Sequence, residues 1–288
     1  MRKAAALDLN LSRLPLVRFG DILAERGGRL QTDPANTGAA NVWSKVPLIT
    51  LTFWIVKILA TTVGETGGDA LSMTLDLGYL VSTLIFLGFF VVTLTAQVAS
   101  RRYHPLFYWL VVVATTTLGT TTSDYMDRTL GLGYIKSSIT LFAGVIVVLV
   151  AWHFVSGRIE FQNVVSRTDE SFYWLTILVA NTLGTALGDF TASDTGLGFE
   201  RGAMVFAVLI AVVAALNFFT RVPKSILFWA AYVLTRPLGA TLGDTLTKSR
   251  EEGGLEFGRI TSTLVMAGAI VIIVAFTSWR ERRAEAAA

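Results

Sequence analysis

Four aspartates that recur at one position of a repeated motif are the residues of this sequence best suited to chemistry. Each aspartate follows a tryptophan by 15 residues and a glycine by 5. Carboxylate oxygens are ligands that hard cations such as Mg²⁺, Mn²⁺, Ca²⁺ or Na⁺ prefer. Copper and zinc fit poorly, because the chain has no cysteine and two histidines. The candidate ligands are Asp69, Asp124, Asp189 and Asp244.

Each aspartate ends a polar stripe whose residues are spaced four apart, which places them near one face of a helix. In the first copy the stripe is Lys57, Thr61, Glu65 and Asp69, and the equivalent positions of the other copies hold many hydroxyl and amide side chains. We expect the four aspartates and Glu65 to bind a cation, and the deeper Lys57 and Arg236 to couple charge. The residues expected to line the site are Thr61, Thr62, Thr116, Thr117, Thr120, Asn181, Thr182 and Thr185.

A polar stripe of this kind should not face lipid, because a charged side chain near the bilayer centre costs at least ~2.5–3.5 kcal/mol. The stripes should therefore face the interior of a helix bundle, where four first helices would bring their aspartates to similar depth. A pair between repeats, Glu65 with Arg236 or an aspartate with Lys57, is expected to neutralise the deep charges. A structural interpretation stays open, because glycine or serine one turn apart is typical of tight helix packing and an aspartate can cap the following turn.

These residues lie in four copies of one sequence unit. Each copy is predicted to form a helix, a short polar turn and a second helix. A second landmark, Leu77-Gly78-Tyr79, recurs at the same offset as Leu132-Gly133-Tyr134 and Leu197-Gly198-Phe199. In the fourth copy a charged insertion moves Leu255-Glu256-Phe257 slightly later. Self-similarity at a fixed period predicts a tandem-repeat architecture.

The repeats resemble a family of bacterial membrane proteins that consist of four tandem two-span repeats, each with a tryptophan, and that are described only as membrane-anchored proteins of unknown function. The resemblance covers roughly Lys45 to Trp279, and its most specific part is the stretch from Thr61 to Asp69. It implies the architecture and a bacterial origin. It implies no activity and no catalytic residue, so a function must be inferred from the residues themselves.

Composition places the helices in a membrane. The chain is 53% hydrophobic and 16% charged, with a mean hydropathy of +0.59, whereas soluble domains carry about 25% charged residues. Apolar stretches such as 81–98 and 204–219 approach the ~20 residues that cross a ~30 Å hydrocarbon core. We predict an all-α polytopic membrane protein with eight transmembrane helices. Its expected parts are a cytoplasmic tail at 1–44, repeats at 45–102, 103–157, 168–220 and 221–279, and a cytoplasmic tail at 280–288.

The distribution of basic residues predicts the orientation. The tails and the connections between repeats hold 16 lysines and arginines, whereas the turns within repeats and their flanks hold 6. Because short basic segments stay on the cytoplasmic side, both termini should be cytoplasmic and the aspartates should lie toward the outer side. The expected location is the inner membrane of a bacterium.

Two functions fit these residues best. The first is a transporter or channel for a small hard cation, such as the divalent Mn²⁺ or Mg²⁺, with or without coupling to protons. The second is a membrane scaffold or sensor that transports nothing. An anion carrier that uses Lys57 and Arg236 is a weaker third, because the stripes hold five acids and two bases.

The remaining expectations are negative or concern partners. The chain has no metalloprotease, hydrolase or nucleotide-binding motif, so we expect neither an enzyme nor a bound cofactor. The expected partners are the lipid bilayer and a small inorganic cation, with no nucleic acid. A homo-oligomer is compatible with the sequence.

Overall fold

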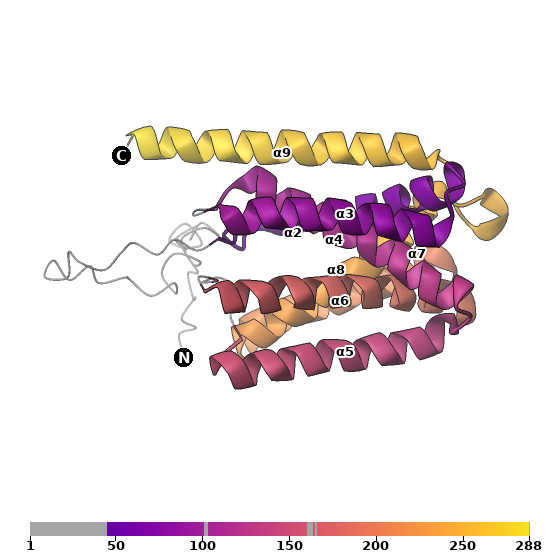
Figure 1. Cartoon of the computed structure of the whole chain (residues 1–288), viewed down its shortest axis with the longest axis horizontal. Coiled ribbons are helices and arrows are strands. Elements are labelled where there is room, and N and C mark those ends of the chain that lie inside the picture. Colours follow the sequence, from indigo (N-terminus) through magenta and orange to yellow (C-terminus); the bar gives the residue numbers. More distant parts are fainter. Residues whose placement is uncertain (1–44, 101–102, 160–163, 165, 288) are drawn as a thin grey trace, which may run out of the picture. The chain divides into compact units, whose positions relative to one another are not determined.

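The computed structural model describes residues 45–100, 103–159, 164 and 166–287. The tail expected at 1–44 therefore lies outside the described residues. Eight long helices and no strand occur in the described part, which confirms the all-α prediction (Figure 1). The helices are α2 (Leu51–Asp69), α3 (Gly78–Ala99), α4 (Pro105–Asp124), α5 (Gly133–Ser156), α6 (Arg167–Asp189), α7 (Gly198–Phe219), α8 (Lys224–Thr247) and α9 (Arg259–Ala287).

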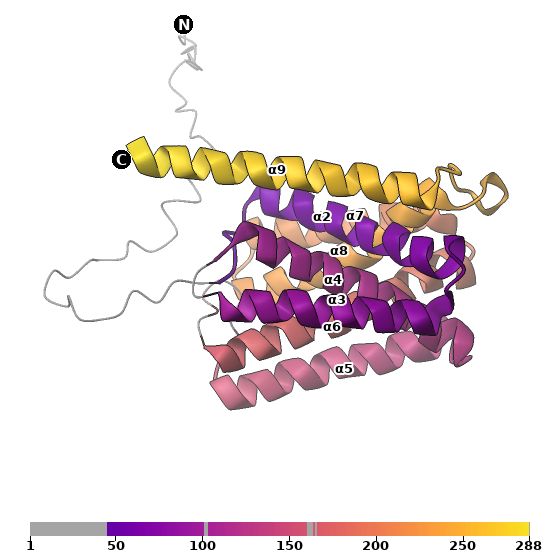
Figure 2. The same cartoon turned by 45° about the horizontal axis from the view of Figure 1, so that its top comes forward.

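The first helices of the four repeats form an inner ring in which α2 packs on α4, α4 on α6, α6 on α8, and α8 back on α2. The second helix of each repeat packs mainly on the first helix of the next repeat: α3 on α4, α5 on α6, α7 on α8, and α9 on α2. Figures 1 and 2 both show the outer helices α5 and α9 at opposite edges of the bundle. Each repeat is therefore held by its neighbours, and the last repeat closes on the first.

Glycines of the repeated motif allow the inner helices to approach closely. A Cβ atom built on Gly64 would stand 2.4 Å from Thr116 Cβ, and one built on Gly239 would stand 2.1 Å from Thr61 Oγ1. The close approach also allows a hydrogen bond between neighbouring helices: the Thr116 hydroxyl donates to the carbonyl of Ala60 at 3.1 Å. Small residues that let helix backbones meet are the usual basis of helix association in membranes.

An aromatic layer forms the end of the inner ring opposite the aspartates. At each interface the residue before one tryptophan packs against the tryptophan of the next helix. The pairs are Phe53 with Trp109, Tyr108 with Trp174, Tyr173 with Trp229, and Phe228 with Trp54, at ring-centroid distances of 5.7, 5.5, 5.7 and 5.8 Å. The repeated tryptophan therefore has a packing role, and these eight residues are called the aromatic layer below.

The turn inside each repeat depends on left-handed backbone conformations. In the first three repeats the inner helix continues into a π-helical turn, at Ala70–Thr74, Tyr125–Thr129 and Phe190–Asp194. The next helix then starts at a glycine with positive φ, and at Gly133, for example, φ is 72°. Glycine adopts this conformation at no steric cost, which explains the glycine of the second landmark. In the fourth repeat Glu256 takes the same conformation, with φ 60°.

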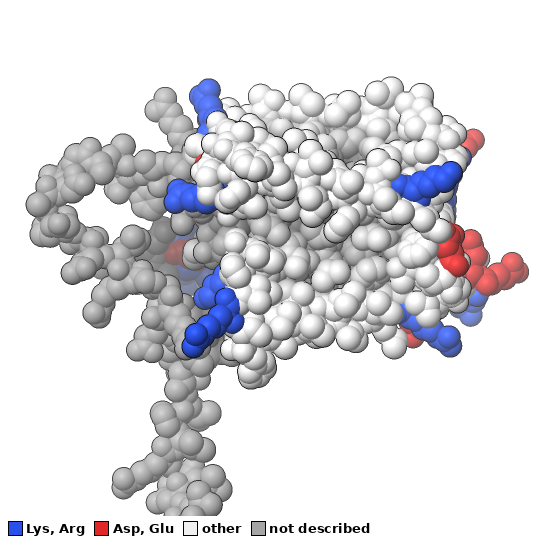
Figure 3. All heavy atoms as spheres, turned by 90° about the horizontal axis from the view of Figure 1, so that it is seen from below, with Lys and Arg blue, Asp and Glu red and all other residues white. Residues whose placement is uncertain are grey.

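The outer surface of the bundle is apolar. Helices α3, α5, α7 and α9 expose large aliphatic and aromatic side chains, such as Val92, Ile139, Val208 and Ile272, along their length. On the face drawn in Figure 3, Lys, Arg, Asp and Glu gather at the two ends and leave an uncharged belt between them. Five helices of the described part, these four and α8, are long and apolar enough to cross a membrane. The bundle therefore has the features of a membrane protein.

Candidate cation site at one end of the inner ring

The inner helices turn their polar stripes toward one another. Every residue expected to line the site is buried, and none of these side chains is more than 4% exposed. Thr62, Thr117 and Thr182 donate to carbonyls of their own helices at 3.0, 3.1 and 3.0 Å. The stripe therefore lies inside the bundle, where helical spacing predicted it.

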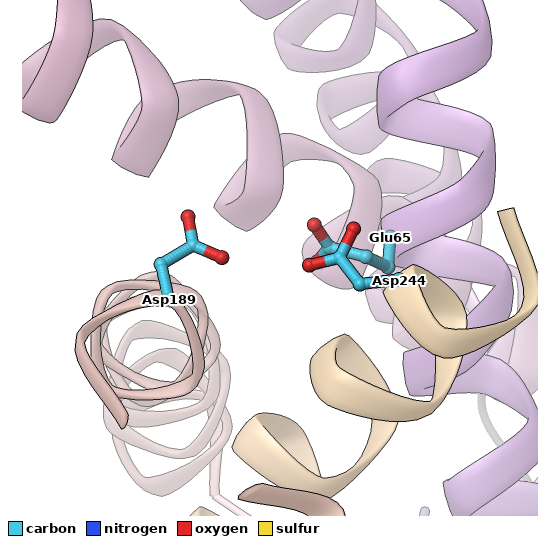
Figure 4. Close-up of side chains that lie close together, drawn as sticks. All are labelled: Glu65, Asp189 and Asp244. Atoms are coloured by element: carbon cyan, nitrogen blue, oxygen red, sulfur yellow. The ribbon is translucent and has the colours of Figure 1, made fainter. Parts of the chain in front are cut away.

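Three carboxylates from three inner helices meet near the end of the ring. Glu65 of α2, Asp189 of α6 and Asp244 of α8 each bring an oxygen within 4.8 Å of the other two. Figure 4 shows Glu65 beside Asp244, with Asp189 facing them. Asp189 Oδ2 and Asp244 Oδ1 are buried and make no hydrogen bond within the described part of the chain. Carboxylate oxygens at this spacing can coordinate one hard cation.

The aspartates of the first two repeats are placed differently. Asp69 and Asp124 are 2% and 1% exposed, so they share the burial of the trio without belonging to it. One oxygen of each, Asp69 Oδ2 and Asp124 Oδ2, is buried without a hydrogen bond in the described residues. The structure thus gathers two of the four predicted aspartates with Glu65 and leaves the other two outside this trio.

Three cationic side chains that the sequence interpretation did not assign to the site lie against these aspartates. Arg128 Nε is 3.2 Å from Asp124 Oδ1, and its Nη2 is 3.6 Å from Asp189 Oδ2. Lys248 Nζ is 3.4 Å from Asp244 Oδ1 and 3.6 Å from Asp69 Oδ2, and Arg259 Nε is 3.4 Å from Asp69 Oδ2. We call the four aspartates, Glu65 and these three bases the mouth. The spacing of four residues from Asp124 to Arg128 and from Asp244 to Lys248 was the available signal, because it places each pair on one helical face.

Carboxylates hold the two turn cations of the mouth in their charged forms. Burial alone would lower the pKa of Lys248, but Asp244 and Asp69 outweigh that effect and raise the pKa above its usual range. Burial likewise opposes the charge on Arg128, and Asp124 and Asp189 again raise the pKa. The mouth therefore contains acidic and basic side chains in direct contact.

Arg236 is about two turns below Asp244 on α8, and its guanidinium reaches the level of Glu65, one turn below the aspartates. Its Nη2 donates to Glu65 Oε2 at 3.0 Å, to Thr185 Oγ1 at 2.7 Å and to the hydroxyl of Thr120. Its Nη1 lies 3.5 Å from the carbonyl oxygen of Thr61. Of the two pairs expected between repeats, the structure thus forms the one between Glu65 and Arg236.

Lys57 lies deeper, and its two nearest polar or aromatic partners are uncharged. Its ammonium is 3.4 Å from Asn181 Oδ1 and 4.2 Å from the ring centroid of Tyr232, and the residue is completely buried. Asn181 in turn donates to Thr115 Oγ1 at 3.0 Å. No carboxylate of the described residues forms an ion pair with Lys57, so the expected pair between an aspartate and Lys57 is absent from this structure.

A ring of inner helices, apolar outer helices and a buried polar axis define the class: a helical-repeat protein of the membrane type. The family described as Repeat of Unknown Function (DUF347) matches the chain in four consecutive segments, 52–103, 107–158, 172–222 and 227–283. These matches span most of the sequence, so the chain belongs to this repeat family, which confirms the four predicted repeats. Searches of curated proteins and of solved structures found no match.

Proposed function

We propose that the chain is an eight-span membrane transporter or channel for a small hard cation, a divalent metal such as Mn²⁺ or Mg²⁺, which binds at the mouth. The observation that carries the proposal is the trio of Glu65, Asp189 and Asp244, whose carboxylate oxygens lie within 4.8 Å of one another in a buried setting. Each of the three carboxylates pairs with a cationic side chain, Arg236, Arg128 or Lys248, so a bound cation would take the place of one of these positive charges.

The balance of charge favours a cation over an anion. Once Arg236 is paired with Glu65, four aspartates of the mouth face three cations within the described residues. A divalent ion could therefore bind if one cationic side chain swings away. The anion-carrier alternative loses support, because Arg236 is already neutralised by Glu65 and Lys57 is enclosed by Asn181 and Tyr232.

The same geometry supports all eight long helices as membrane spans. The inner helices α2, α4 and α6 have 19, 20 and 23 residues, and a helix of ~20 residues spans ~30 Å. Their polar faces turn inward, and the apolar helices α3, α5, α7 and α9 surround them. With the basic residues between repeats on the cytoplasmic side, both termini would be cytoplasmic and the mouth would open outward, in the inner membrane of a bacterium.

Measurement of cation flux in the Asp189→Asn variant and in the unaltered protein distinguishes a transporter from a scaffold. The purified protein is reconstituted in liposomes that contain a fluorescent indicator for Mn²⁺, and uptake is compared with that of the unaltered protein. Asparagine keeps the size and one acceptor of aspartate, so loss of charge is isolated from loss of packing. We expect flux to fall by at least tenfold while the melting temperature stays within a few degrees. Equal flux in both proteins would show that transport does not use the Asp189 carboxylate, and no flux in the unaltered protein would favour the scaffold or sensor.

A further inference from the structure

We propose that a second cation site lies directly beneath the mouth aspartates, in a cage of oxygen atoms that Arg236 fills in this structure, and that the cage takes a monovalent cation such as Na⁺ when the guanidinium leaves. The cage consists of the Glu65 carboxylate, the hydroxyls of Thr120 and Thr185, and the carbonyl of Thr61. The inference deepens the proposed function and rests on it for any part that this site plays in transport.

The cage has the geometry of a cation site, and the cation in it is the guanidinium of Arg236. The guanidinium of Arg236 is completely buried, and its partners belong to α2, α4 and α6, whereas Arg236 itself comes from α8. Glu65 Oε2 lies 3.0 Å from the guanidinium and Thr185 Oγ1 lies 2.7 Å from it. A carboxylate, two hydroxyls and a carbonyl form an oxygen set of the kind that coordinates hard cations, so an inorganic ion would need no new ligand.

The charge of the cage selects a monovalent ion. Glu65 is the acid that pairs with Arg236, and the aspartates one turn higher are held by Arg128, Lys248 and Arg259 in the described structure. An unbalanced charge buried in a low-dielectric interior is expensive, so an occupant with one positive charge fits best. The cage oxygens all have the guanidinium as a partner, whereas Arg236 Nε is buried and makes no hydrogen bond within the described residues.

The equivalent positions of the other repeats suggest which substitutions to test at Arg236 and Glu65. Thr61 and Thr116 occupy the place of Arg236 in the first two repeats, and Thr120 and Thr185 occupy the place of Glu65 in the second and third. The stem of Arg236 crosses Gly184, where a built Cβ would lie 2.3 Å from Arg236 Cγ. Threonine at 236 would therefore leave a space beside the cage oxygens that an ion can enter.

Thermal unfolding of the full chain in detergent tests the site, with sodium chloride compared with choline chloride at equal ionic strength. Arg236→Thr frees the cage, and we expect a saturable rise in melting temperature that sodium causes and choline does not, on the order of 5 °C at a concentration of about 100 times Kd. The double variant Glu65→Thr with Arg236→Thr lacks the carboxylate and should show no such rise. The unaltered protein should respond to sodium no more than the double variant does, because Arg236 occupies the cage.

Each other outcome overturns the proposal. Equal sodium responses in the single and double variants would place any sodium outside the cage. Stabilisation of Arg236→Thr by acid but not by sodium would mean that Glu65 takes up a proton instead of an ion. Arg236→Asn, which installs the residue of position 181, gives the same test if the threonine variant does not fold. If neither single variant folds in sodium while the double variant folds, the cage does not accept a cation.

This experiment is separate from the flux assay. If the unaltered protein moved no Mn²⁺ in liposomes, the proposed transport would fail, whereas sodium binding to Arg236→Thr would still establish the cage. If Mn²⁺ flux were present and sodium had no effect on the threonine variant, transport would stand and the cage would fail.

Discussion

Gly64 of α2 lies against Thr116 of α4 so closely that a Cβ atom on the glycine would stand 2.4 Å from Thr116 Cβ. The neighbouring backbone gives little room to move, because the carbonyl carbon of Thr116 would lie 2.9 Å from the same Cβ. This contact joins the first and second repeats at the level of Arg236. It makes the packing of the inner ring testable with a single methyl group.

Gly64→Ala should destabilise the protein although alanine is the better helix former. The overlap would force the two helices apart at a cost of roughly 1–3 kcal/mol, as overpacking does elsewhere. Gly88→Ala is the matched control, because Gly88 lies in the outer helix α3 and a Cβ there meets nothing within 4 Å. That change should be neutral or stabilising by up to ~1 kcal/mol. Unfolding in detergent measures both, and similar melting temperatures for the two variants would contradict the close approach.

Tyr108 and Tyr173 should show strong coupling in a double-mutant cycle. Their hydroxyls are hydrogen-bonded at 2.7 Å in the buried aromatic layer, where the other two repeats carry Phe53 and Phe228. Either single change to phenylalanine leaves one buried hydroxyl without this partner and should cost about 1–3 kcal/mol. The double variant, which has phenylalanine in all four repeats, should be nearly as stable as the unaltered protein. Additive costs would show that the hydrogen bond contributes nothing.

Lys248→Met should raise the apparent affinity for Mn²⁺. The ammonium lies 3.4 Å from Asp244 Oδ1 and 3.6 Å from Asp69 Oδ2, where it competes with an incoming ion. Removal of one unit charge at ~4 Å is worth roughly 1–4 kcal/mol, which corresponds to a gain in affinity of about fivefold or more. Arg250→Gln is the control, because the side chain of Arg250 is 84% exposed and pairs with Glu256 at 3.9 Å. Concentration dependence of flux measures the affinity, and a loss of affinity in Lys248→Met would contradict competition at the mouth.

Much of the fold follows from the sequence, because repetition and helical spacing are local signals. The Trp–Gly–Asp offsets predicted four copies, and the spacing of Lys57, Thr61 and Glu65 predicted a buried face. The packing of each second helix on the next repeat was not predictable, since the apolar surfaces of α3, α5 and α7 would fit either neighbour. Sequence reasoning reached the pair of Glu65 with Arg236 as one of two options, and the structure selects it.

The basic half of the mouth was missed because its residues lie beyond the repeated motif. Arg128 and Lys248 follow their aspartates by four residues, but the equivalent position is Met73 in the first repeat and Ser193 in the third. Arg259 reaches Asp69 from α9, at a separation in sequence that no periodicity indicates. The acids recur in every repeat and are therefore predictable from the sequence, whereas the cations that pair with them do not recur.

Lys57→Met should leave the protein as stable as before or make it more stable. The ammonium is completely buried with an amide oxygen at 3.4 Å and an aromatic ring at 4.2 Å, and no carboxylate of the described residues pairs with it. Replacement of buried charges by apolar side chains of similar volume is often neutral or stabilising by ~1–4 kcal/mol. The second and third repeats carry Val112 and Ile177 at this position, so an apolar side chain fits the ring.

A buried basic side chain without an acidic partner among the described residues is suited to carry a proton, and Lys57→Met also tests this role. If Lys57 carries the proton in coupled transport, Mn²⁺ flux through Lys57→Met should no longer respond to a pH gradient across the liposome, while flux driven by the Mn²⁺ gradient persists. Val112→Met is the control, because it places the same side chain at the equivalent position of α4. A Lys57→Met protein that is destabilised by several kcal/mol would show that the ammonium has a stabilising partner. Flux that still followed the pH gradient would assign the proton to another group.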